Sequence, residues 1–214
     1  MARSIVLFGA PGAGKGTLAE KIKKIMPVVH VSTGDLLREN VRSGTDVGKK
    51  AKEFMDQGKL VPDDIVIAMV KERISKDDAK KNGFMLDGFP RTLEQAQALD
   101  KVAKMDAVVV IDIKKEDLKK RILGRRSCPT CGKIYNIYNE QLMPKKAGFC
   151  NDDNTPLIQR DDDNEVTFEK RWNTYLGQSD GVINYYSKMP GMVRHVDGTR
   201  TMAITEAELK KVLG

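Results

Sequence analysis

Histidine is scarce in this chain, with only two copies among 214 residues. Both of them, His30 and His195, lie within short apolar runs at 28–31 and 193–196. We therefore interpret them as packed strand residues rather than as catalytic bases. No Ser-His-Asp arrangement is evident either, so the sequence disfavours enzymes that generate a nucleophile with a histidine base.

Long apolar runs are also missing, since no stretch of the chain approaches the roughly 20 residues that a membrane-spanning helix requires. The first strand pattern begins near Ile5, which leaves no room for a secretory signal peptide. We therefore expect a cytoplasmic protein without a membrane partner. At 40% hydrophobic and 31% charged residues, the composition is that of an ordinary soluble protein.

Aromatic residues make up only 6% of the chain, although its formal net charge is +7. A positive balance permits nucleic-acid binding. The lysines are spread along the chain, however, and no cluster of aromatic side chains offers a platform for stacking bases. We therefore interpret the charge as a solvated lysine-rich surface together with a site for a smaller polyanion, and we expect no nucleic-acid partner.

The three cysteines all fall in one short segment, as Cys128, Cys131 and Cys150. The first two form a C-x-x-C pattern followed by Gly132, and Asp153 stands where a second C-x-x-C would be completed. Three thiolates and one carboxylate can hold a tetrahedral zinc ion that has no place left for water. The sequence therefore predicts a structural zinc site that folds a segment of low apolar content. Asp152 is an alternative fourth ligand, and three unconnected buried thiols are the simpler alternative.

Five short apolar runs alternate with longer segments of helical pattern, at 5–8, 28–31, 84–86, 108–113 and 193–196. This alternation predicts an α/β fold, in which a parallel five-stranded sheet is flanked by helices. Helices are expected near 18–26, 63–70, 92–103, 116–123, 166–187 and 205–213. Two segments break the rhythm and are interpreted as inserts, at 33–61 and 126–163. The core would then comprise residues 1–32, 62–125 and 164–214.

The first apolar run leads directly into Gly9-Ala10-Pro11-Gly12-Ala13-Gly14-Lys15-Gly16-Thr17, which matches the phosphate-loop pattern G-x-x-x-x-G-K-[ST]. Glycines allow the backbone to curl until several N–H groups point at one anion, and the helix behind adds its positive end. Lys15 can reach the β- and γ-phosphates of a nucleoside triphosphate, and Thr17 can offer its hydroxyl to Mg²⁺. The order strand, loop, helix therefore predicts a P-loop NTPase-type core rather than a simple glycine-rich turn.

The remaining candidate residues are mostly arginines, namely Arg38, Arg91, Arg121, Arg125, Arg160 and Arg171. A kinase that acts on an alcohol benefits from a base, whereas a phosphate group with a second pKa of about 6 is already largely anionic at neutral pH. Such an acceptor needs charge neutralisation and alignment, which planar guanidinium groups supply. The sequence thus favours phosphoryl transfer onto a phosphate. Asp87 and Asp112 both end strand patterns, and either could serve a magnesium ion.

Taken together, these motifs resemble the adenylate kinase family, in its form with a long, zinc-bearing lid. The similarity covers essentially the whole chain, from the phosphate loop to the segment 196–199. Its most specific elements are the phosphate loop, 32–35 with Arg38, 58–62, 87–91 with Gln95, 124–126, and Arg160 with Arg171. The resemblance implies the reaction MgATP + AMP ⇌ 2 ADP, which maintains adenine nucleotide balance. We expect a monomer, although the sequence leaves the oligomeric state open.

The resemblance also implies roles for individual residues. ATP would contact Gly12, Ala13, Gly14, Lys15, Gly16, Thr17, Arg121, Arg125, Ile134, Tyr135 and Arg200. AMP would contact Thr33, Arg38, Lys59, Leu60, Val61, Gly88, Phe89, Pro90, Arg91, Gln95, Arg160 and Arg171, with Gln95 reading the adenine. The catalytic residues would be Lys15, Arg38, Arg91, Arg125, Arg160 and Arg171, and the hydrated magnesium ion would be organised by Asp35 and Asp87. The insert 33–61 would bind AMP, and the insert 126–163 would be a lid with zinc held by Cys128, Cys131, Cys150 and Asp153.

A few positions depart from the family's usual pattern. Asn136 stands where a histidine often follows the lid tyrosine, Met143-Pro144 replaces a Pro-Pro pair, and Gly181-Val182 replaces a Pro-Leu. The nearest alternative is a nucleoside monophosphate kinase that prefers UMP, CMP or GMP, because base selection depends on a few contacts near 59–61 and Gln95. A zinc-ribbon nucleic-acid binder with an NTPase switch, and a scaffold with a vestigial loop, are further alternatives.

Overall fold

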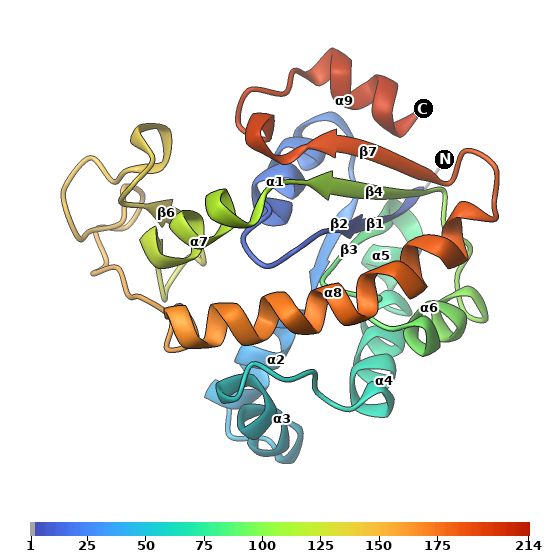
Figure 1. Cartoon of the computed structure of the whole chain (residues 1–214), viewed down its shortest axis with the longest axis horizontal. Coiled ribbons are helices and arrows are strands. Elements are labelled where there is room, and N and C mark those ends of the chain that lie inside the picture. Colours follow the sequence, from blue (N-terminus) through green and yellow to red (C-terminus); the bar gives the residue numbers. More distant parts are fainter. Residues whose placement is uncertain (1–2) are drawn as a thin grey trace.

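The computed structural model describes residues 3–214 and has a five-stranded β-sheet at its centre (Figure 1). The strands are β1 (Arg3–Phe8), β2 (Val29–Ser32), β3 (Gly83–Asp87), β4 (Ala107–Asp112) and β7 (Val193–Asp197). Their order is β2-β3-β1-β4-β7, and every neighbouring pair is parallel. The predicted α/β fold and its parallel sheet are confirmed.

Helices cover both faces of the sheet because its strands are apolar on both faces. Alternate residues of a strand point to opposite sides, so Val6 and Val108 join one apolar cluster while Ile5 and Val109 join the other. The first cluster is closed mainly by α4 (Asp63–Ile74), α6 (Leu93–Asp100) and the later turns of α8 (Glu165–Ser187). The second is closed mainly by α1 (Lys15–Ile25), α7 (Lys115–Gly124) and α9 (Glu206–Leu213). The core therefore forms two layers around the sheet.

All six helices expected for the core are present, and their ends differ from the expected ones by a few residues. The helix α1 begins at Lys15 rather than near residue 18, and α6 ends at Asp100 rather than near residue 103. Sequence patterns missed α5 (Asp77–Asn82) and the single turns η1 (Glu140–Leu142) and η2 (Gly198–Arg200), which are too short and polar to show periodicity. Among residues 3–214, no helix combines the length and the apolar character that crossing a bilayer demands.

The insert 33–61 consists of two helices, α2 (Thr33–Arg42) and α3 (Asp46–Asp56). The side chain of Ser32 caps α2 by accepting from the N–H of Asp35, and that of Thr45 caps α3 by accepting from the N–H of Gly48. Gly48 lies directly against the end of α2, where an added Cβ would be 2.1 Å from the carbonyl oxygen of Asn40. Close contact between the two helices therefore depends on this glycine.

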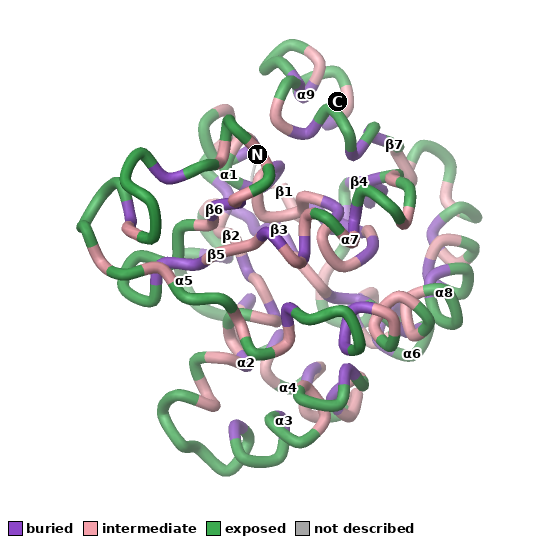
Figure 2. The backbone as a smooth tube through the Cα atoms, turned by 60° about the vertical axis from the view of Figure 1, so that its left-hand side comes forward, coloured by how far each residue is buried: buried purple, intermediate pink, exposed green. Residues whose placement is uncertain are grey.

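The insert 126–163 contains a small antiparallel sheet of β5 (Arg125–Ser127) and β6 (Ile134–Asn136), which the sequence did not reveal. Its only apolar cluster within the described residues consists of Cys128, Tyr135 and Cys150, with Leu157 packed against them. Figure 2 shows that most of this segment and of the insert 33–61 is exposed, in contrast to the sheet. Burial of apolar surface alone is thus a weak source of stability for 126–163.

The two ends of the insert 126–163 are attached to neighbouring helices, since it follows α7 and precedes α8. These helices are joined on the surface by ion pairs, Lys115 with Glu169 at 2.6 Å and Lys119 with Glu165. The insert extends beyond the carboxyl ends of β4 and β7, at the left of Figure 1. It meets the insert 33–61 there, where Arg42 donates to the carbonyl oxygen of Pro129 at 3.5 Å.

The tight contact at Gly48 predicts opposite effects for two helical glycines. We expect Gly48→Ala to lower the free energy of unfolding by about 1–3 kcal/mol, because its methyl group would force α2 and α3 apart. Gly177→Ala, in α8, should instead raise it by about 0.5–1 kcal/mol, because beyond its neighbours in the helix no atom of residues 3–214 lies within 4 Å of the place that its methyl group would take. Urea denaturation of both variants measures the difference, and a Gly48→Ala protein as stable as the parent would contradict the packing described.

Candidate active site

The phosphate loop joins the carboxyl end of β1 to the first turn of α1. Gly12 and Gly14 adopt φ values of +83° and +98°, which side chains with a Cβ rarely tolerate. No side chain in the described part of the chain caps α1, so its first N–H groups keep their hydrogen-bonding capacity for an anion. The predicted strand-loop-helix arrangement is therefore present, with the positive end of a helix at its centre.

The side chain of Lys15 folds back over this loop. Its Nζ donates to the carbonyl oxygens of Gly9 and Ala10, at 2.9 and 3.1 Å. Burial is the main cause that lowers the pKa of Lys15 to about 8; the charge of Asp87 opposes this shift, and the charges of Arg91 and Arg171 contribute to it. The ammonium group therefore stands in a strongly positive surrounding that a polyanion would neutralise.

Five arginines converge in front of the loop, from elements far apart in the sequence: Arg38, Arg91, Arg125, Arg160 and Arg171. Burial lowers the pKa of Arg91, and the nearby charge of Arg171 lowers it further. Burial also lowers the pKa of Arg160, to which the charges of Arg125 and Arg38 contribute. The positive charge around Arg91 and Arg160 is therefore only partly balanced by acidic neighbours. The cluster is thus built to receive negative charge.

Aspartates fix three of these arginines in place. Arg125 forms a two-pronged pair with the buried Asp163, through Nε at 2.7 Å and through Nη2. Arg171 donates to Asp162 at 2.6 Å. In the insert 33–61, Arg38 pairs with Asp35, whose carboxylate lies 3.9 Å from Nη2 of Arg160. Two-pronged and charged hydrogen bonds hold the planar guanidinium groups in defined directions.

The acidic residues at the strand ends differ in their surroundings. Asp87, at the end of β3, lies beside Lys15 and Arg91, and its Oδ2 is 3.4 Å from Nε2 of His30. Burial opposes its ionisation, but His30 and Lys15 hold the pKa of Asp87 below its ordinary value. Asp112, at the end of β4, pairs at 2.8 Å with His195 on the edge strand β7. Of the two, Asp87 is the carboxylate that belongs to the cationic cluster.

The surroundings of the two histidines correct one expectation. His30 is half-buried in β2, as a packed strand residue would be. His195 is exposed, with 58% of its side chain accessible, because β7 lies at the edge of the sheet. The prediction of a packed side chain, which was based on the apolar neighbours of His195 in the sequence, is therefore wrong for this residue.

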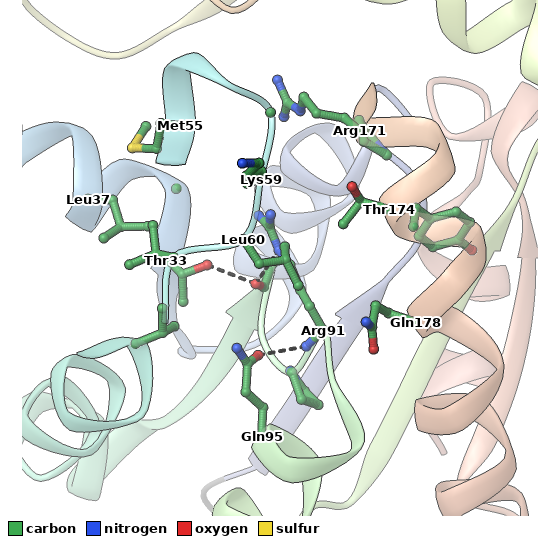
Figure 3. A pocket seen from close by; sticks show the side chains of 18 of the residues that line it. Thr33, Leu37, Met55, Lys59, Leu60, Arg91, Gln95, Arg171, Thr174 and Gln178 are labelled. Carbon is green, nitrogen blue, oxygen red and sulfur yellow. Dashed lines mark hydrogen bonds between the residues drawn. The ribbon is translucent and has the colours of Figure 1, made fainter. Parts of the chain in front are cut away.

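A cavity opens between the phosphate loop, the insert 33–61 and α8 (Figure 3). Its lining includes the predicted residues Thr33, Arg38, Lys59, Leu60, Val61, Gly88, Pro90, Arg91, Gln95 and Arg171. The hydroxyl of Thr33 donates to the carbonyl oxygen of Gly88 at 2.9 Å, which joins the insert to the end of β3. Phe89 is almost fully buried in the core, so its side chain does not line the cavity.

Two of the residues predicted to face ATP, Arg121 and Arg200, lie at the single turn η2. Arg121 donates to the carbonyl oxygens of Ala13 and Gly198, at 3.3 and 2.9 Å. Arg200 is exposed in η2 and pairs with Glu208 of α9 at 3.0 Å. Tyr135 differs from the expectation, because its side chain is buried within the insert 126–163 and its hydroxyl lies 3.3 Å from Sγ of Cys150. Only the main chain of Tyr135, next to the half-buried Ile134, is left to face a nucleotide.

The three cysteines and Asp153 lie together, with one ligand atom from each within 4.8 Å of the others. Two pairs of these atoms are at short range: Sγ of Cys131 and Cys150 at 3.6 Å, and Sγ of Cys128 and Oδ2 of Asp153 at 3.3 Å. Four ligands around a tetrahedral zinc ion, with Zn–S of about 2.3 Å, would be about 3.5–3.8 Å apart. The donor set and its spacing therefore fit zinc.

The neighbouring Asp152, the alternative fourth ligand, is directed elsewhere. Both of its carboxylate oxygens accept from Nζ of Lys133 at 2.8 Å. The N–H of Cys131 donates to Sγ of Cys128 at 3.4 Å, as expected for a C-x-x-C turn that presents two thiolates to one metal. Asp153 is the carboxylate that completes the cluster.

Comparison with known proteins agrees with this geometry. A family model described as adenylate kinase matches residues 7–190. The chain belongs to the adenylate kinase family. It is 48% identical to an adenylate kinase of Caldicellulosiruptor bescii and 45% identical to one of Kosmotoga olearia, in each case over 98% of both chains. An adenylate kinase of Staphylococcus aureus is 43% identical over the same share of each chain. The resemblance inferred from the motifs is thus confirmed, and with it the assignment to the nucleoside monophosphate kinases.

Several residues at this adenylate kinase site were not singled out in the sequence. The helix α8 lines the cavity with Thr174, Gln178 and Ser179, on the side opposite α2 in Figure 3. The acidic partners Asp162 and Asp163 were also missed, although the run Asp161-Asp162-Asp163 just before α8 was a visible signal. Such a run has an ordinary explanation as negative charge at a helix start, so by itself it does not indicate partners for arginines.

The lowered pKa of Lys15 predicts proton uptake when this adenylate kinase family member binds a triphosphate. Negative phosphates would raise a pKa that is about 8 in the free protein, so Lys15 should take up a proton at pH 8 but already carry it at pH 6.5. Calorimetry with a non-hydrolysable ATP analogue, in buffers of different ionisation enthalpy, measures the protons exchanged. Uptake at pH 8 should vanish in Lys15→Met, and equal uptake at both pH values in the parent protein would refute the assignment.

Proposed function

We propose that this protein transfers the terminal phosphoryl group of MgATP to AMP in the reversible reaction MgATP + AMP ⇌ 2 ADP. It would thereby maintain the balance of adenine nucleotides, with ATP, AMP and ADP as its ligands. The observation that carries the proposal is the convergence of five arginines and Lys15 where the phosphate loop meets the adjoining cavity. Two phosphate-bearing ligands that meet there would be held end to end.

The reaction needs no base at this site. In the forward direction, an oxygen of the AMP phosphate forms a bond to the γ-phosphorus, and the bond between that phosphorus and the β–γ bridging oxygen breaks. The acceptor oxygen is already anionic near neutral pH, because the second pKa of a phosphate monoester is about 6. The barrier is then set by charge repulsion and alignment, which cationic side chains relieve.

Each cationic residue has a role that follows from its place. Lys15 would exchange its carbonyl partners for the β- and γ-phosphate oxygens of ATP, and the free N–H groups at the start of α1 would donate to the same phosphates. Arg38 and Arg91, which line the cavity, would hold the phosphate of AMP. Arg125, Arg160 and Arg171 would stabilise the group in transfer, with Asp162 and Asp163 fixing the directions of two of them.

Magnesium fits the acidic residues beside these cations. Asp87, with Asp35 at the start of α2, would hold the hydrated ion through water, and Thr17 would offer its hydroxyl. When bound, the ion supplies positive charge to the β- and γ-phosphates. The low pKa of Asp87 keeps its carboxylate ionised for that purpose.

The chain would be divided into a core, an AMP-binding insert at 33–61 and a lid at 126–163, and the insert and the lid would exclude water from the site. Water in the site could accept the phosphoryl group and waste ATP, so the site must be covered during transfer. Contacts between the two inserts, such as that of Arg160 with Asp35, support a mode of closure in which lid and insert meet over the ligands. The protein would act as a monomer in the cytoplasm, without a nucleic-acid partner.

A structural zinc ion held by Cys128, Cys131, Cys150 and Asp153 would give the lid the rigidity that its small apolar cluster does not supply. We expect about one zinc ion per purified chain by elemental analysis, because four protein ligands form a closed site. Cys150→Ser should lose most of the metal and lower the melting temperature. Asp152→Asn, which alters the pair with Lys133 outside the cluster, should keep it. Protein purified without chelator that contains no zinc would refute the site.

An assay of ADP formation tests the proposed reaction directly. With ATP and magnesium present, AMP should be the best acceptor among AMP, GMP, UMP and CMP, and omission of a monophosphate should leave only slow hydrolysis. Lys15→Ala and Arg91→Ala should each lower kcat by about two orders of magnitude or more while the circular dichroism spectrum is retained. Preference for UMP, CMP or GMP would move the protein to another branch of the monophosphate kinases, and turnover of ATP alone would refute the proposal.

A further inference from the structure

The carboxamide of Gln95 is held by two partners that permit only one orientation. Its Oε1 accepts from the backbone N–H of Arg91 at 2.8 Å, as drawn in Figure 3, and its Nε2 donates to Oδ1 of Asp63 at 2.7 Å. A backbone N–H can only donate and an ionised carboxylate can only accept. A rotated amide would place oxygen against carboxylate and N–H against N–H, so the order of its donor and acceptor is fixed.

Asp63 acts on Gln95 from outside the cavity. It is the first residue of α4, directly after the insert 33–61, and it is not among the residues that line the cavity. Its second oxygen accepts from the hydroxyl of Thr92 at 2.6 Å, and that hydroxyl in turn caps α6 by accepting from the N–H of Gln95 at 3.1 Å. Asp63, Thr92 and Gln95 therefore form a closed network that joins the starts of α4 and α6.

After these contacts, the Gln95 amide keeps one N–H and one oxygen lone pair for a ligand. Adenine carries a donating amino group at position 6 beside an accepting ring nitrogen, whereas guanine and hypoxanthine carry an accepting carbonyl oxygen there. An amide that could rotate by 180° would match either arrangement of donor and acceptor on the base. An amide with a fixed orientation can match only one of the two arrangements.

We propose that Asp63 is a positioning residue that sets base selection, by holding the Gln95 amide in the orientation that suits a 6-amino purine and opposes a 6-oxo purine. This inference rests on the proposed function, in which the cavity takes a nucleoside monophosphate and Gln95 meets its base. Asp63 itself touches no ligand, and its effect passes through Gln95 alone. The network lies just after the insert 33–61 in the chain and not within it. The orientation of the Gln95 amide is therefore set before the insert covers the ligand.

The test compares AMP with IMP, which differs from it at position 6, as acceptors for the full-length protein at saturating MgATP. For Asp63→Leu we expect KM for AMP to rise, and the ratio of kcat/KM for AMP to that for IMP to fall by about tenfold or more. KM for ATP should stay unchanged. In Asp63→Asn the side-chain oxygen can still accept from Gln95, so this variant should recover most of the discrimination.

The neighbouring Asp64 provides a matched control. It is exposed, shares the first turn of α4 and therefore contributes the same charge to the helix start. Asp64→Leu should leave the AMP to IMP ratio at the parent value. If Asp63→Leu does not fold, as judged by circular dichroism, Asp63→Ser replaces it, because the short hydroxyl cannot reach Gln95.

The outcomes separate this inference from the proposed function. A parent protein that phosphorylates no monophosphate would refute the proposed function. A parent that prefers AMP, with a folded Asp63→Leu or Asp63→Ser variant of unchanged AMP to IMP ratio, would refute the role of Asp63 alone. A parent that uses AMP and IMP equally well would also overturn it, because there would be no selection for Asp63 to set.

Discussion

Incompletely balanced positive charge is the constraint around which this site is organised. Lys15, Arg91 and Arg160 each have a lowered pKa, because burial and neighbouring cations both disfavour their charged forms. Folding therefore assembles a cluster that is electrostatically unfavourable on its own. Its free energy falls when phosphate groups enter, and it falls most when the largest negative charge is concentrated between the cations. The aspartates beside the cluster relieve only part of the repulsion between these cations. Their hydrogen bonds also fix the orientations of the guanidinium groups.

The parallel sheet makes this assembly possible. Because all five strands run in one direction, their carboxyl ends meet at one edge, and the loops that follow β1 and β3 place Lys15 and Arg91 side by side. The apolar clusters on both faces keep that edge rigid. The inserts then add Arg38 from one side and Arg160 from the other. Because the two inserts join the core at separate places in the chain, each brings its arginine to the site from its own side.

Sequence patterns were sufficient to predict those parts of the fold that are formed by one continuous stretch of the chain. The phosphate loop, the five strands and the C-x-x-C turn each occupy a continuous stretch whose residue types fix its conformation. Long-range pairing was not visible in the same way. Nothing in the chain indicates that Arg125 pairs with Asp163 rather than with Asp162, because such pairs depend on how α7, β5 and α8 meet. The strand patterns alone left Asp87 and Asp112 equivalent, and only the family resemblance favoured Asp87, because their surroundings depend on where β3 and β4 lie in the sheet. Gln178 is recognisable only once the cavity-facing side of α8 is known.

The attachment of the segment 126–163 has a consequence for how the chain can vary. Its two ends are held next to each other by α7 and α8, whose surfaces are linked by the pairs of Lys115 with Glu169 and Lys119 with Glu165. When the ends of a loop are already adjacent, adding or removing residues changes its closure entropy only slowly, by about 0.6 kcal/mol for each doubling of length. The stability of the sheet is therefore nearly independent of how long this segment is. Related chains can therefore differ in the length of this segment without rebuilding the sheet to which it is attached.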